Sequence, residues 1–194
     1  MFTEPTPGSL ADLGPEADAE QVARTIALRR LESAPRTRAE LASTLAKRGV
    51  PAPVADAVLD RFTEVGLIDD AAFANAWVTS RHHGRGLGRR ALAGELRRKG
   101  VDPELVAQAI DQIDGDDERE RAVALAHRKA PGLAHLPQEK ALRRLVGHLT
   151  RKGYAPGPAF EVSREALSEV AASATDRADE AEPGDADAAD DRGR

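Results

Sequence analysis

The chain has 194 residues, no cysteine and a formal net charge of −5. The absence of cysteine excludes a disulfide framework and thiolate chemistry, and no apolar run approaches the ~20 residues of a membrane span. The N-terminus lacks the basic and apolar pattern of a signal peptide. We therefore expect a cytoplasmic protein of one domain with tails, without a membrane contact and without a cofactor.

Charge is distributed unevenly along the chain. Residues 1–16 carry three acids and no base, and residues 172–194 carry eight acids and three arginines. Residues 17–171 carry 25 Lys or Arg against 22 Asp or Glu, so the central part is mildly basic. Bases and acids also cluster separately within it: residues 140–153 hold five bases and no acid. This segregation predicts a surface with a basic side.

In chain order, Pro and Gly in residues 1–16 predict a flexible lead-in, and helical patterns begin at residue 17. Thr37 and Glu40 have the spacing of a capping box at the start of a second helix. Asp69 or Asp70 can cap a fourth helix, and an Asp-Pro pair at residues 102–103 starts a sixth. The spacing predicts nine helices, of which the last ends at Ala171 and includes Phe160 among its apolar residues.

One signal, Leu-x-basic-basic-Gly-apolar, occurs three times at intervals of 51 and 53 residues. Glycine suits the left-handed position after a helix, and cations suit its last turn. A repeat of this length predicts stacked supersecondary units that share a core. The third copy, in which Tyr154 replaces an aliphatic residue and two prolines follow, is expected to be irregular. The copies are Leu45–Val50, Leu96–Val101 and Leu149–Tyr154.

The fold class that follows is all-α, an elongated tandem array of three three-helix repeats with a disordered acidic C-terminal tail. The tail is too acidic and too poor in apolar residues to fold. The expected segments are a flexible tail over 1–16, repeats over 17–66, 67–114 and 115–171, and the disordered tail over 172–194.

The most basic stretch is 81–101, which holds seven Arg or Lys and the single acid Glu95. Arginine pairs with phosphate through its planar fork, so these side chains are candidates for binding a polyanion. Basic residues near the other two glycine turns extend the candidate surface. The candidates are Arg81, Arg85, Arg89, Arg90, Arg97, Arg98, Lys99, Lys47, Arg48, Lys140, Arg143, Arg144, Arg151 and Lys152.

Catalytic and metal chemistry have weak support. Asp69-Asp70 could begin a metal or acid/base site, but capping is favoured because no further ligand lies at the required spacing. The link at residues 82–88 has three glycines, yet no strand precedes it as a nucleotide loop requires. We interpret it as a hinge, with His82 and His83 exposed.

Two blocks of this sequence are similar to the RecX family. The first runs from Arg36 to Val50 and continues through Gly66-Leu67-Ile68-Asp69-Asp70 with Phe73-Ala74 and Trp77-Val78. The second consists of Gly84 to Arg90 and Glu95 to Val101. The resemblance implies tandem three-helix repeats that lie along the groove of the filament of RecA on single-stranded DNA. It further implies inhibition of filament extension, strand exchange, ATP hydrolysis and co-protease activity, in DNA repair and the SOS response.

Alternatives remain at this stage. The first is a general nucleic-acid-binding helical repeat without a recombinase partner, which predicts tight binding to naked DNA. An enzyme is disfavoured, and a purely structural adaptor is disfavoured only by the charge segregation. Under the resemblance, the partners are the RecA filament, single-stranded DNA and, more weakly, duplex DNA, and the protein is a monomer.

Overall fold

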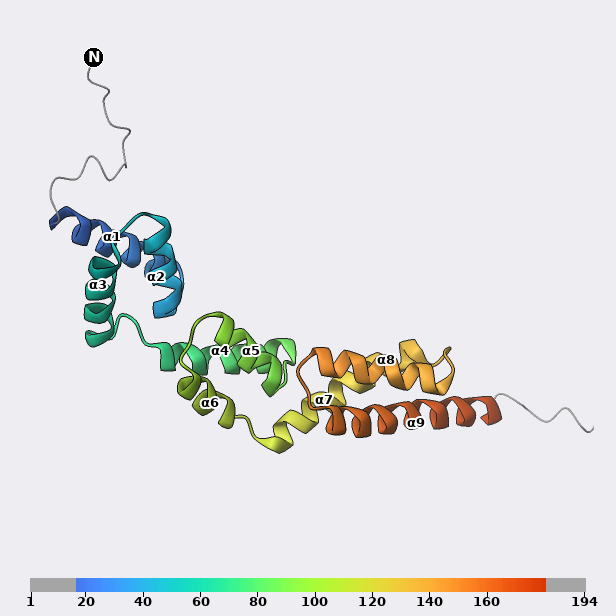
Figure 1. Cartoon of the computed structure of the whole chain (residues 1–194). Coiled ribbons are helices and arrows are strands. Elements are labelled where there is room, and N and C mark those ends of the chain that lie inside the picture. Colours follow the sequence, from blue (N-terminus) through green and yellow to red (C-terminus); the bar gives the residue numbers. More distant parts are fainter. Residues whose placement is uncertain (1–16, 181–194) are drawn as a thin grey trace, which may run out of the picture. The chain divides into compact units, whose positions relative to one another are not determined.

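The computed structural model describes residues 17–180, and every regular element in that range is a helix. The chain divides after Asp114 into two compact units (Figure 1). The helices of the first unit are α1 (Ala17–Ser33), α2 (Arg38–Lys47), α3 (Ala52–Glu64), α4 (Asp70–Arg85), α5 (Arg89–Arg98) and α6 (Pro103–Asp111). Those of the second are α7 (Gly115–Lys129), the 3-10 helix η2 (Ala130–Leu133), α8 (Gln138–Arg151) and α9 (Pro156–Glu180). The prediction of an all-α fold with nine α-helices is confirmed for these residues.

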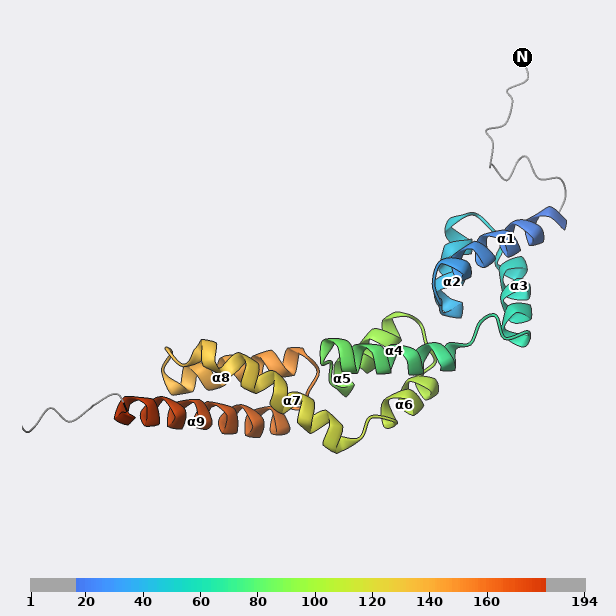
Figure 2. The same ribbon diagram turned by 180° about the vertical axis from the view of Figure 1, so that it is seen from behind.

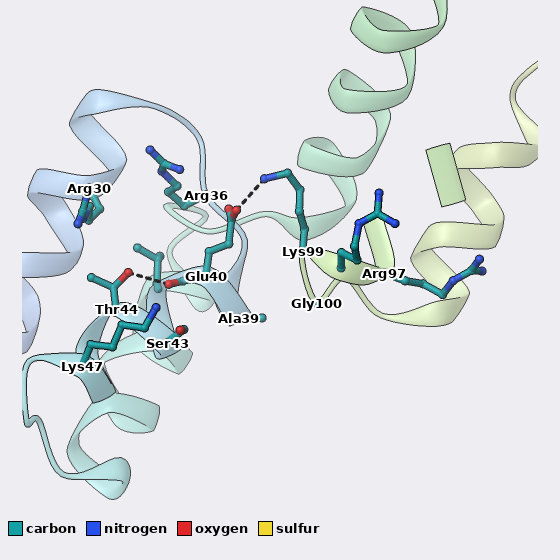
Figure 3. A pocket seen from close by; sticks show the side chains of 12 residues that line it. Arg30, Arg36, Ala39, Glu40, Ser43, Thr44, Lys47, Arg97, Lys99 and Gly100 are labelled. Carbon is teal, nitrogen blue, oxygen red and sulfur yellow. Dashed lines mark hydrogen bonds and ion pairs between the residues drawn. The ribbon is translucent and has the colours of Figure 1, made fainter. Parts of the chain in front are cut away.

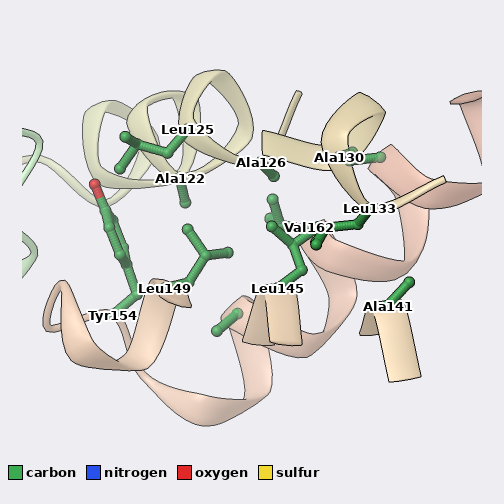
Figure 4. Packing of buried hydrophobic residues seen from close by; sticks show 12 residues of the cluster. Ala122, Leu125, Ala126, Ala130, Leu133, Ala141, Leu145, Leu149, Tyr154 and Val162 are labelled. Carbon is green, nitrogen blue, oxygen red and sulfur yellow. The ribbon is translucent and has the colours of Figure 1, made fainter. Parts of the chain in front are cut away.

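Each set of three consecutive helices encloses its own cluster of buried side chains. Two leucines of the central helix lie in each cluster, as Leu92 and Leu96 do in the second. In the second unit α8 and α9 lie side by side (Figure 2), and Leu125, Leu149 and Val162 point toward one another from three helices (Figure 4). The expectation that the repeats share one core is therefore wrong, because each set closes around its own leucines.

The three glycine turns have one hydrogen-bond pattern. In each, the N–H after the glycine donates to the leucine carbonyl five residues earlier, and the glycine N–H donates three residues back. This is the Schellman arrangement, and it requires a left-handed residue at the glycine. The third turn is as regular as the others, since Tyr154 is buried there and takes the place of the aliphatic residue. The expected irregularity is therefore wrong. The glycines are Gly49 (φ 76°), Gly100 (φ 75°) and Gly153 (φ 97°).

The last helix is longer than predicted. It continues past Ala171 to Glu180, so residues 172–180 are helical rather than disordered. Alanine is frequent in this segment, and its high helix propensity extends the helix although few apolar residues are available to anchor it. Phe160 lies on the exposed side of α9, whereas Val162 and Ala166 are buried. The rest of the predicted C-terminal tail and the predicted N-terminal tail lie outside the described residues.

The predicted hinge is mostly helix. Helix α4 runs to Arg85, and only Gly86 takes the left-handed conformation, with φ 59°. His82 is buried, and its Nδ1 lies 2.8 Å from the Leu87 carbonyl oxygen. The prediction that His82 is exposed is wrong, because its side chain lies against the segment at Leu87 that leads to α5. His83 is exposed, as predicted.

Candidate functional site: two basic hollows

The larger group of cations surrounds a hollow of about 460 Å³ in the first unit. It lies between the end of α1, the exposed side of α2 and the turn that ends α5 (Figure 3). We call it the first hollow. One acid, Glu40, is among its lining residues. The cations that line it are Arg30, Arg36, Lys47, Arg97, Arg98 and Lys99.

The predicted capping box of Thr37 and Glu40 is confirmed, and its Glu40 lines the first hollow. The Thr37 hydroxyl accepts the Glu40 N–H at 3.1 Å, and Glu40 accepts the Thr37 N–H at 3.3 Å. The same hydroxyl donates to the Lys99 carbonyl oxygen at 2.7 Å. Because Thr37 is fully buried, this hydroxyl connects the first three-helix set to the second and satisfies a carbonyl at the end of α5.

Lys99 completes this connection. Its Nζ lies 2.6 Å from Glu40 Oε1 and 4.3 Å from the centre of the Trp77 ring. Burial raises the pKa of Glu40, but the hydrogen bonds from Lys99 and from the Thr37 N–H outweigh burial and lower it below its ordinary value. The side chains are 20% and 27% exposed, so water screens the pair only partly. We call Thr37, Glu40 and Lys99 the clasp.

The backbone is closely packed beside the clasp. A Cβ on Gly100 would lie 2.3 Å from the Ala39 Cβ, a separation that forces one of them to move. Asp70 makes a second link between the sets, because its carboxylate accepts the Arg38 N–H at 2.9 Å. Burial raises the pKa of Asp70 despite that bond. Its neighbour Asp69 accepts the Ala72 N–H at 2.8 Å, so the capping interpretation of this pair is confirmed for Asp69.

Several cations of the basic stretch contact the protein itself. Arg81 lies over the Trp77 ring at 4.2 Å, on the same residue that Lys99 contacts. Arg89 donates from its guanidinium to the Ile113 carbonyl oxygen and so holds the end of α6. Glu95, the acid of this stretch, accepts the Trp77 indole N–H at 2.8 Å. These side chains fix the second helix set.

The remaining predicted cations of the first unit are exposed. Arg97 and Arg98 line the first hollow together with Lys47, which comes from the first repeat. Arg48, Arg85 and Arg90 are exposed but do not line the hollow. Sequence reasoning missed Arg30 and Arg36, although Arg30 is in the last turn of α1 and could have been found by the same basic-end signal.

A second hollow, of about 470 Å³, lies in the second unit between the end of α7, η2 and α8. No acid is among its lining residues, which are Lys129, Leu133, Arg143, Arg144, His148 and Arg151. Burial lowers the pKa of His148, and Lys129, Lys152, Arg151 and Arg128 lower it further by repulsion. Of the predicted cations, Lys140 is exposed and Lys152 is half-buried, and neither lines the hollow. Sequence reasoning missed Lys129 and His148, although Lys129 is in the basic last turn of α7 and His148 lies one helix turn from Arg144 and Arg151 on α8.

Within residues 17–180 no group of three or more His, Asp or Glu side chains is arranged to hold a metal ion. No helix in this part of the chain has the length and apolar character needed to cross a membrane. Both hollows bring together several Lys and Arg side chains, a combination that suits phosphate or carboxylate groups.

Comparison with known sequences gives a consistent picture. Residues 23–62 match the family description "RecX, first three-helix domain", and residues 69–110 match "RecX, second three-helix domain". The chain is 53% identical to Regulatory protein RecX of Streptomyces coelicolor over 165 residues, which cover 84% of this chain and 88% of that protein. It is 49% identical to Regulatory protein RecX of Mycolicibacterium smegmatis over 147 residues, covering 74% of this chain and 78% of that one.

Solved structures show the same fold. The crystal structure of RecX from Lactobacillus salivarius superposes with a TM-score of 0.71 at 21% identity, over 77% of this chain and 97% of that chain. A second crystal structure of a regulatory protein RecX gives 0.70 at 23% identity, over 77% of this chain and 73% of that chain. The sequence relatives and the shared three-helix domains together place this chain in the RecX family of regulatory proteins.

Proposed function

We propose that this protein restrains the RecA recombinase by binding along the groove of the RecA filament on single-stranded DNA. In this proposal it limits filament extension and with it strand exchange, ATP hydrolysis and co-protease activity. The observation that carries the proposal is the first hollow, where six cations from two three-helix sets surround one acid. That acid is paired with Lys99, so the exposed arginines keep their charge available for a partner.

The geometry of the first hollow favours phosphate as the group it receives. Arg97 and Arg98 are consecutive residues at the end of α5, and they line the first hollow together with Lys47 of α2. A guanidinium binds two phosphate oxygens at once, and charge-assisted hydrogen bonds of this kind are the strong ones. The clasp connects the two sets, so the helix ends that carry these cations need little rearrangement when the ligand binds.

The second hollow supports the proposal independently. It presents Lys129, Arg143, Arg144 and Arg151 without an acid among its lining residues. Each unit thus carries one concentrated cationic site. A filament repeats the same phosphate and protein groups at regular intervals, so a chain with two such sites gains avidity from a polymer that a single phosphate group cannot provide.

The aromatic residues favour a nucleoprotein filament over naked single-stranded DNA. General single-strand binders stack bases on exposed aromatic rings. Here Trp77 is occupied by Arg81 and Lys99, Tyr154 is buried, and Phe62 is buried. Phe160 is the one exposed aromatic side chain among the described residues, and it lines neither hollow. A phosphate contact without base stacking is what a protein-coated strand requires.

The test is inhibition of the ATPase activity of preformed RecA filaments by protein added below the RecA concentration. We expect the wild-type chain to inhibit, and Arg97→Glu with Arg98→Glu to raise the half-inhibitory concentration by at least about 100-fold, since each of the two lost charge-assisted bonds contributes about 1.5–3 kcal/mol. The matched control, Arg24→Glu with Arg61→Glu, reverses two exposed arginines outside both hollows and should inhibit like wild type. Absence of inhibition by wild type, or equal loss in both variants, would overturn the proposal.

A further inference from the structure

The first unit also contains an apolar groove, distinct from the first hollow. It has a volume of about 580 Å³ and lies between the end of α1, the turn that precedes α4 and one side of α4. Leu67 is 48% exposed at this groove, although it belongs to a turn whose other apolar residue, Ile68, is buried. The apolar residues that line the groove include Leu31, Pro35, Leu67, Phe73 and Trp77.

The walls of this groove are held rigidly. Trp77 is fixed by the hydrogen bond from its indole N–H to Glu95, and Phe73 stacks on it with ring centres 5.6 Å apart. Both rings contact the clasp through Lys99. A rigid aromatic wall loses little conformational entropy when a ligand is bound, which is typical of sites that anchor a partner protein.

The rim of the groove is cationic. Arg36 and Arg81 line it, and neither forms a salt bridge with a described residue. The Arg36 Nε–H is buried and has no hydrogen-bond partner among the described residues, which leaves a donor that an added acceptor could satisfy. Asp69, the acid at this rim, is already engaged as the cap of α4. The rim therefore complements a carboxylate.

We propose that this groove binds the recombinase protein itself, by receiving an apolar side chain that is followed or preceded by an acidic residue. The inference rests on the proposed function and deepens it, because it assigns protein contact to the apolar walls of this groove and phosphate contact to Arg97 and Arg98 of the first hollow, while Arg36 lines both. A phosphate does not suit the apolar lining. Burying one leucine-sized side chain contributes about 1.5–3 kcal/mol, equivalent to roughly 10- to 100-fold in affinity.

The experiment compares two probes, a RecA filament on labelled single-stranded DNA held with a non-hydrolysable nucleotide, and the same DNA without RecA. Leu67→Asn keeps the charge and removes the exposed apolar contact, and Ala76→Gln fills the groove from its exposed side. The control is Val65→Asn, because Val65 is 51% exposed two residues away and does not line the groove. Thermal unfolding by circular dichroism verifies that all three variants fold.

We expect Leu67→Asn and Ala76→Gln to weaken filament binding at least 10-fold while their affinity for naked DNA and the filament affinity of Val65→Asn stay within twofold of wild type. Wild-type protein that fails to bind the filament overturns both the proposed function and the groove. Filament binding by wild type that both groove variants retain overturns the groove alone, as does a parallel loss of affinity for naked DNA. Loss of self-association in place of filament binding would assign the groove to a second copy and overturn the inference.

Discussion

The two basic hollows are built in different ways. The first takes its cations from two three-helix sets and depends on the clasp, in which Thr37 and Glu40 from one set hold Lys99 from the other. The second is formed by α7, η2 and α8, which belong to one set with one core. A candidate site between repeats thus requires a structural connection that a site within a repeat does not. One of the predicted ligand-binding cations, Lys99, makes that connection.

We expect the largest effect on stability where Gly100 of the second helix set packs against Ala39 of the first, beside the first hollow. Gly100→Ala forces a left-handed alanine, at about 1–2 kcal/mol, and drives its methyl into Ala39, at about 1–3 kcal/mol more. Gly66→Ala is the matched control, since Gly66 has φ +73° and nothing within 4 Å of an added Cβ. Chemical denaturation should show the Gly100 variant as the less stable by more than 1 kcal/mol. Equal losses of stability in the two variants would mean that Ala39 moves aside easily and that the contact between Gly100 and Ala39 is loosely packed.

The clasp itself should have a smaller effect. Lys99→Met keeps the packing on Trp77 but removes the charge-assisted bond to Glu40, so we expect a loss of about 1–2 kcal/mol of stability. In a double-mutant cycle with Glu40→Gln, the coupling energy should be about 1 kcal/mol. Lys140→Met, an exposed change on α8, should stay within about 0.5 kcal/mol of wild type.

Acid should abolish the ion pair between Glu40 and Lys99, as the Lys99→Met substitution does. The pKa of Glu40 is lower in the folded protein than its ordinary value of 4.5, so its contribution to stability is full above that value. The contribution disappears as the pH falls through the lower folded pKa. Glu40→Gln should lack this part of the acid-induced loss, and a coupling energy in the cycle that does not change with pH would contradict the role of the pair.

The smallest predicted effect is a pH dependence of binding at the second hollow, which His148 lines. Burial and surrounding cations hold the pKa of His148 below 6.5, and a bound phosphate would offset that repulsion and raise it. Binding should therefore take up a proton, so affinity for single-stranded DNA, whose phosphodiesters do not titrate in this range, should rise about threefold between roughly pH 8 and pH 6. His148→Gln should remove this rise and Lys140→Gln should not. A pH profile that is the same in both variants would exclude His148 from the site.

The sequence predicts local features well. The three glycine turns, the Thr37 capping box and the Asp102 cap follow from residues within one helix turn of each other, and all are present. Contacts over longer separations were not predicted. Glu40 and Lys99 are 59 residues apart, and nothing in either neighbourhood signals the pair. The same reason explains the missed Arg36, which contributes to the first hollow only because two helix sets meet there.

Two further differences also have physical causes. The run of glycines after Arg81 suggested a hinge, yet Gly84 is tolerated inside α4 and one left-handed glycine, Gly86, makes the turn. The acidic residues after Ala171 predicted disorder there. The alanines among residues 171–180 favour helix instead, and α9 extends to Glu180. Helix propensity explains the longer α9, whereas α4 continues to Arg85 despite the low helix propensity of Gly84.

The most direct measurement is the salt dependence of filament binding. Arg97→Gln with Arg98→Gln should reduce the slope of log Kobs against log salt by about 1.4, since each phosphate contact on a single strand contributes about 0.7. Arg24→Gln with Arg61→Gln should leave the slope unchanged. If the two double variants have the same slope as wild type, Arg97 and Arg98 do not contact phosphate, and the first hollow is not the nucleic-acid site of this protein.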